Sequence, residues 1–111
     1  MKKNNENAPI ANLIEILNQI IEIVKYQYTD LTWSRFESID ELINELQDHI
    51  KKLEKRDFSK LNELTLLFAP TASLQEISIS SGWASKFLKI SEKFDLAIEE
   101  IKHKFKENTN V

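Results

Sequence analysis

Few residues in this chain could carry out acid–base or nucleophilic chemistry. Its 111 residues include two histidines, His49 and His103, one glycine and no cysteine. A thiolate nucleophile and a cysteine-ligated zinc site are therefore excluded. No serine lies in the G-x-S-x-G setting of a hydrolase nucleophile, and a single glycine does not build a phosphate-cradling loop. We expect a protein that is not an enzyme and that uses no cofactor.

The segment around His49 has a spacing that is typical of one known reaction. His49 is followed by Lys52, three positions later, in the sequence HIKKL. This is similar to histidine phosphotransfer domains, which are four-helix bundles with an exposed histidine and a lysine at the same spacing. Leu53 stands where that family has a small residue beside the phosphorylated ring. The resemblance implies a phosphotransfer relay through His49 as an alternative function.

His103 ends an E-x-x-H pattern that begins at Glu100. Di-iron bundles use this i, i+3 pair twice, with two further glutamates, and all of these side chains point inward. The chain has one copy, and helical periodicity places His103 away from the stripe that contains Ile101 and Phe105. We expect no metal site and a solvated His103.

Apolar residues recur at the i, i+3, i+4, i+7 spacing of amphipathic helices along most of the chain. The predicted fold is all-α: a small antiparallel helical bundle of four main helices, with a short helical segment around residues 74–80. The predicted limits are a disordered N-terminal tail at 1–8, a single bundle domain at 9–107 and a frayed C-terminus at 108–111.

Turn and capping signals divide the middle of the chain. Capping boxes at Ser38–Glu41 and Ser73–Glu76 predict two helix starts. Pro70 and Gly82 predict the ends of the third helix and of the short segment. Residues 77–80 alternate with period 2 and also suit a strand, but a lone strand would have no partner, so we favour a helix.

The first predicted helix has an unusually wide apolar face. Its main stripe runs from Ile10 to Tyr28, and Ile16 and Ile23 form a second strip outside it. Packing on one neighbour does not require so wide a face. Either this helix is central in the bundle, or Ile16 and Ile23 belong to a homodimer interface.

Charge and hydropathy exclude two classes of partner. The net charge is −3, and six acids between Asp30 and Asp48 are offset only by Arg35. The basic cluster at residues 51–56 falls at a helix end, where cations complement the helix dipole, so we expect no nucleic-acid binding. Polar residues interrupt the apolar stretch at 10–24, so we expect no membrane span. Without cysteine or a signal-peptide core, the predicted location is the cytoplasm.

The remaining interpretation is a surface for another protein. Trp33, Phe36 and Trp83 fall at predicted helix junctions, and aromatic side chains often anchor interfaces. The acidic region favours a basic partner. We predict a small non-enzymatic bacterial or phage interaction module, such as an adaptor, antitoxin or immunity-like regulator. The predicted partner-binding residues are Trp33, Phe36, Glu41, Glu45, Leu74, Glu76, Ile77 and Trp83.

Overall fold

The computed structural model describes residues 8–109, with side chains up to residue 104. In this range the chain has no strand and forms five helices: α1 (Ala8–Tyr26), α2 (Ile39–Glu54), α3 (Leu61–Leu67), α4 (Ser73–Ser81) and α5 (Ala84–Thr109). The predicted all-α bundle is confirmed, including the short helix near residues 74–80. The predicted tail lies outside the described residues except for Ala8, which begins α1. The frayed end predicted from residue 108 is helical at 108–109, and 110–111 lie outside the description.

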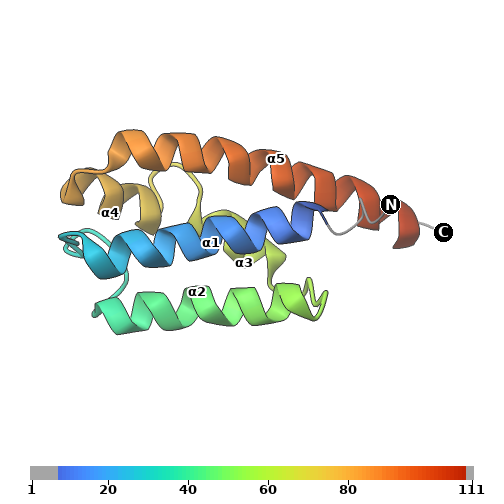
Figure 1. Cartoon of the computed structure of the whole chain (residues 1–111), viewed down its shortest axis with the longest axis horizontal. Coiled ribbons are helices and arrows are strands. Elements are labelled where there is room, and N and C mark those ends of the chain that lie inside the picture. Colours follow the sequence, from blue (N-terminus) through green and yellow to red (C-terminus); the bar gives the residue numbers. More distant parts are fainter. Residues whose placement is uncertain (1–7, 110–111) are drawn as a thin grey trace.

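Helix α1 lies between α2 and α5 and runs antiparallel to both (Figure 1). The described chain measures 44 × 25 × 22 Å along its principal axes. Ile16 and Ile23 are only 4% and 8% exposed, so the wide apolar face of α1 serves two neighbours within one chain. The prediction of a central first helix is confirmed. The alternative, a homodimer contact through Ile16 and Ile23, stays a prediction, with little of either side chain exposed in the single chain.

The apolar seam of α5 follows the spacing expected from the sequence. Its buried members, together with the residue just before the helix, are Trp83, Phe87, Ile90, Phe94, Ala97 and Ile101. The ring of Phe68, which follows α3, stacks on that of Phe94 with centroids 3.8 Å apart. Offset and stacked aromatic pairs add to the stabilisation that burial gives. This contact ties the C-terminal end of α3 to α5.

Of the two predicted helix caps, the serine cap of α2 is formed and that of α4 is not. Ser38 caps α2 as predicted: its Oγ accepts a hydrogen bond from the backbone N–H of Glu41, with 3.1 Å between the atoms. The Glu41 carboxylate accepts the N–H of Glu37 at 2.7 Å. Ser73 does not cap α4, because Ala72 occupies the cap position and Ser73 is already helical. Its hydroxyl is used by another part of the chain.

Serine hydroxyls of α4 tie this helix to the connection between α1 and α2. Ser81 Oγ accepts the backbone N–H of Asp30 at 2.7 Å, and Ser73 Oγ accepts that of Arg35 at 3.3 Å. Ser78 is buried and donates to the Gln75 carbonyl at 2.8 Å. Three of the four serines of α4 therefore satisfy backbone groups, and their hydroxyls are not free for a partner.

Two apolar residues are more exposed than the stripes predicted. Tyr28 is 74% exposed, because α1 ends at Tyr26 and the chain leaves the helical face before reaching it. Ile39, the first residue of α2, is 37% exposed. None of the helices in the described range has the combined length and apolar character that crossing a membrane requires.

Candidate functional site

The structure divides the eight predicted partner-binding residues into two groups. Four are at most 4% exposed and belong to the core: Phe36, Leu74, Ile77 and Trp83. Their partner-binding role was predicted without settling whether they are exposed, and they are covered because the α1–α2 connection and α4 fold back onto the bundle. Trp83 packs edge-on against Phe87, with ring centroids 6.2 Å apart. A partner would have to unfold this end of the bundle to reach these side chains.

The other four predicted residues are accessible to different degrees. Trp33 is 72% exposed and Glu41 is exposed, whereas Glu45 and Glu76 are half-buried. Glu45 is engaged by Arg35 in a two-pronged ion pair, in which Nη1 donates to Oε1 at 3.1 Å and Nη2 pairs with Oε2. Only Trp33 offers a large apolar surface to a partner.

Trp33 lies at the rim of a hollow between the α1–α2 connection and α3, which we call the Trp33 hollow. Its volume is about 370 Å³, and its lining consists of Trp33, Arg35, Glu63, Leu66, Leu67, Thr71, Ala72 and Ser73. Leu66 is 65% exposed. The hollow therefore joins two exposed apolar side chains and two charged side chains.

Leu66 and Glu63 were not predicted as site residues. The sequence does contain an indication of Leu66, because this apolar residue lies outside the face of α3 that contains the buried Leu64 and Leu67. An apolar residue outside the buried stripe of a short helix is free to face solvent or a partner. Its proximity to Trp33, some thirty residues earlier, depends on the tertiary fold.

A second hollow of about 520 Å³ adjoins the first through Arg35 and Glu63. We call it the His49 hollow, and its lining consists of Arg35, Asn44, Glu45, Asp48, His49, Lys60 and Glu63. Arg35 is neutralised by Glu45, and that hydrogen-bonded pairing raises the pKa of the guanidinium. The charges that remain are Asp48 and Glu63 against Lys60, so the excess is acidic.

His49 lines the His49 hollow but is almost completely buried, with 4% of its surface exposed. Burial lowers the pKa of its imidazole, although the nearby carboxylates of Glu45 and Asp48 act in the opposite direction. A phosphotransfer reaction requires an imidazole that a phosphoryl donor can reach. Burial of His49 therefore counts against that interpretation.

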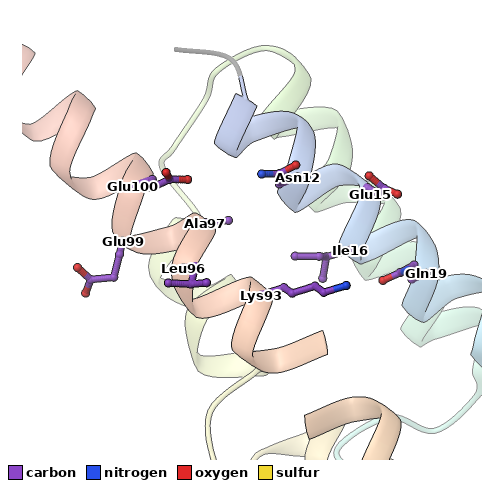
Figure 2. Close-up of a pocket in the computed structure, with 9 residues that line it drawn as sticks. All are labelled: Asn12, Glu15, Ile16, Gln19, Lys93, Leu96, Ala97, Glu99 and Glu100. Atoms are coloured by element: carbon purple, nitrogen blue, oxygen red, sulfur yellow. The ribbon is translucent and has the colours of Figure 1, made fainter. Parts of the chain in front are cut away.

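A third concave region lies between α1 and α5, and we call it the α1–α5 groove (Figure 2). It has a volume of about 500 Å³ and is lined by Asn12, Glu15, Ile16, Gln19, Lys93, Leu96, Ala97, Glu99 and Glu100. Leu96 is 68% exposed, and sequence analysis did not single it out. Glu100, from the E-x-x-H pattern, is one of the residues that line this groove.

Metal-ligating side chains do not gather anywhere in the described part of the chain. No group of three or more His, Asp or Glu side chains there is arranged to hold an ion. His103 is exposed on α5, one turn beyond Glu100. Comparison with known proteins gives no relative: no family model matches the chain, and neither a curated protein nor a solved structure matches it.

Proposed function

We propose that this chain is a small non-enzymatic interaction module that binds a basic protein partner at the Trp33 hollow. The class of function is that of an adaptor, an antitoxin or an immunity-like regulator of bacterial or phage origin. The observation that carries the proposal is the position of Trp33, a tryptophan 72% exposed at the rim of a hollow that Leu66 also lines. Exposed tryptophan beside a concave surface is typical of interface anchors.

The charges around the two adjoining hollows define the partner. Asp48, Glu63 and the exposed Glu41 outnumber Lys60 once Arg35 is paired with Glu45. Charge complementarity favours a partner that places lysine or arginine over this region and an apolar side chain against Trp33. Acidic residues at the rim would mainly raise the association rate, and the aromatic contact would supply most of the affinity.

The connection that carries Trp33 is held in place before any partner arrives. Its backbone N–H groups at Asp30 and Arg35 are bonded to Ser81 and Ser73 of α4. The guanidinium of Arg35 also lies over the ring of the buried Phe36, 4.3 Å from its centroid. A surface that is ordered in the free protein loses less conformational entropy on binding.

The test compares Trp33→Ala with Tyr28→Ala in tagged pull-downs from the native host. Tyr28 is a matched control, because it is 74% exposed on the same connection and does not line the Trp33 hollow. Calorimetry with the purified partner should show binding weakened about tenfold or more by Trp33→Ala, because hot-spot aromatics contribute at least 1–2 kcal/mol. Tyr28→Ala should bind like the wild type.

Two results would contradict the proposal. One is a stoichiometric partner that Trp33→Ala binds as tightly as the wild type does. The other is the absence of any stoichiometric partner under several growth conditions. Glu63→Lys gives an independent check, because reversing a charge beside the hollow should slow association with a basic partner. Circular dichroism should show that each variant keeps the helical content of the wild type.

A further inference from the structure

The α1–α5 groove has an apolar floor and an unpaired polar rim. Ile16 and Ala97 are 4% and 2% exposed at its floor, and Leu96 stands exposed beside them. Among the described residues, the charged groups of Glu15, Lys93 and Glu100 take part in no ion pair or hydrogen bond within the chain. An apolar centre with a polar edge is the usual composition of a protein interface.

The two helices place matching residues at both ends of this groove. In Figure 2, Lys93 extends from α5 towards α1 at one end, and Glu100 points towards Asn12 at the other. Lys93 and Glu100 are seven residues apart, and so are Asn12 and Gln19 on the antiparallel α1. Seven residues correspond to about two helical turns. One end therefore carries Lys93 and an amide side chain, and the other carries Glu100 and an amide side chain. Glu99 also lines the second end, but its side chain points away from α1 in Figure 2.

This arrangement is complementary to itself. A twofold axis that lies across the groove, near Ala97, would stack two copies with their α5 helices antiparallel. Lys93 of each copy would then face Glu100 of the other, and Asn12 would face Gln19. The exposed Leu96 side chains lie near the axis and would meet there. An interface in which residue i contacts j while j contacts i is what a twofold dimer requires.

We infer that the α1–α5 groove binds a second copy of this chain in a twofold-symmetric dimer, with Leu96 at its centre and two Lys93–Glu100 ion pairs across it. The contact involves only about two turns of each helix, which is smaller than a standard interface. The dimer should therefore be in exchange with monomer. This surface is separate from the Trp33 hollow, so either proposal stands if the other fails.

Glu15 also lies close to the proposed axis and would approach its own symmetry copy. Figure 2 shows its side chain at the outer rim, on the side of α1 away from α5. Salt weakens the repulsion between like charges at a solvated rim, because the screening length is about 8 Å at physiological ionic strength. The association should therefore be measured at physiological salt or above.

Sedimentation equilibrium of the full chain tests the inference. From about 10 μM to about 1 mM, the average mass should rise from the monomer value of 13.0 kDa towards twice that value. Leu96→Glu should weaken the dimer about tenfold or more, because it places two like charges in the apolar centre. Leu88→Glu is the matched control: Leu88 is 60% exposed on α5 and does not line the groove.

A charge swap identifies the pairing. Lys93→Glu and Glu100→Lys should each weaken the dimer about fivefold or more, since each places two like-charged pairs across the axis. The double variant Lys93→Glu/Glu100→Lys should recover to within about threefold of the wild type. Trp33→Ala should leave the dimer unchanged.

The inference is overturned by any of three outcomes: a wild-type mass that stays at the monomer value, equal effects of Leu96→Glu and Leu88→Glu, or no recovery in the double variant. All of these substitutions fall on exposed side chains, and circular dichroism verifies that the helices are retained.

Discussion

His49 is the buried titratable side chain among those that the structure describes. It lies on α2 with Glu45 and Asp48 on the same helix, and with Lys60 and Glu63 facing it from the start of α3 and from α3 itself. Loss of hydration disfavours the imidazolium, and this effect exceeds the attraction of the carboxylates, so the folded pKa lies below the ordinary 6.5. Folding therefore favours the neutral ring.

This burial predicts an acid-sensitive stability. As the pH falls below the ordinary histidine pKa of 6.5, the unfolded chain binds a proton that the folded chain resists. The free energy of unfolding should therefore fall with decreasing pH, until the pH is below the folded pKa of His49. Urea denaturation between pH 7.5 and pH 5, at intervals of about half a pH unit, measures this slope.

The variant His49→Gln distinguishes the contribution of this histidine to the pH dependence of stability from that of the carboxylates. It should flatten the slope in that range, since glutamine does not titrate. Gln47→His is the control, because position 47 is exposed on the same helix and a solvated imidazole titrates alike in folded and unfolded chains. An unchanged slope in His49→Gln would show that burial of this ring does not govern the acid response.

Residue types at helix junctions did not reveal which aromatic side chains are displayed. Trp33, Phe36 and Trp83 have similar local contexts, yet Trp33 is 72% exposed and the other two are 4% exposed. Their burial depends on how the α1–α2 connection and the α4–α5 corner fold onto the bundle. No periodicity encodes those contacts, so the sequence indicated Trp33 but did not indicate that Phe36 and Trp83 are buried.

At the scale of elements, the α4–α5 corner depends on one backbone conformation. Gly82 ends α4 with φ of +89°, in the left-handed region that side chains with a Cβ disfavour. A Cβ placed there would meet no atom within 4 Å. The cost of substitution is therefore backbone strain without steric overlap.

We expect Gly82→Ala to lower the free energy of unfolding by about 1–2 kcal/mol, the cost of left-handed geometry for a residue with a Cβ. Gly82→Asn should cost less, because asparagine adopts this region more readily. Urea titrations of the three proteins measure the difference. Equal stability of the alanine variant and the wild type would mean that the corner relaxes to another conformation.

The sequence predicted where the helices lie better than how they begin. Long apolar stripes located α1, α2 and α5, because burial of one face dominates the stability of a helix. The Ser73 box correctly indicated a helix but for the wrong reason: the Ser73 hydroxyl accepts the N–H of Arg35 and caps nothing. A capping pattern cannot reveal that a distant backbone group competes for the same oxygen.

At the scale of the whole molecule, the concave regions arise from the relative placement of helices. The wide apolar face of α1 allowed either a central position or a homodimer contact. The structure shows the central position, because α1 packs against both α2 and α5 and buries Ile16 and Ile23. The Trp33 hollow and the α1–α5 groove each combine residues from segments far apart in sequence. Without the angles between helices, the sequence alone did not predict either of them.

The central position of α1 also predicts how the molecule unfolds. Leu17 is fully buried in this helix, which contacts both α2 and α5. Leu17→Ala removes apolar contacts from the middle of the bundle and should lower the free energy of unfolding by about 2–5 kcal/mol. Leu88→Ala, at an exposed position on α5, should change it by less than about 0.5 kcal/mol.

Because α1 packs against helices on both sides of the bundle, a substitution that destabilises α1 should not unfold one side of the bundle alone. Far-ultraviolet circular dichroism reports all helices. The change in tryptophan fluorescence on unfolding reports mainly Trp83, which is buried where α4 meets α5, because Trp33 is already 72% exposed in the folded chain. In Leu17→Ala the two signals should follow one shared transition in urea, at a lower midpoint than in the wild type. Separate transitions would instead mean that α4 and α5 form a unit whose stability does not depend on α1.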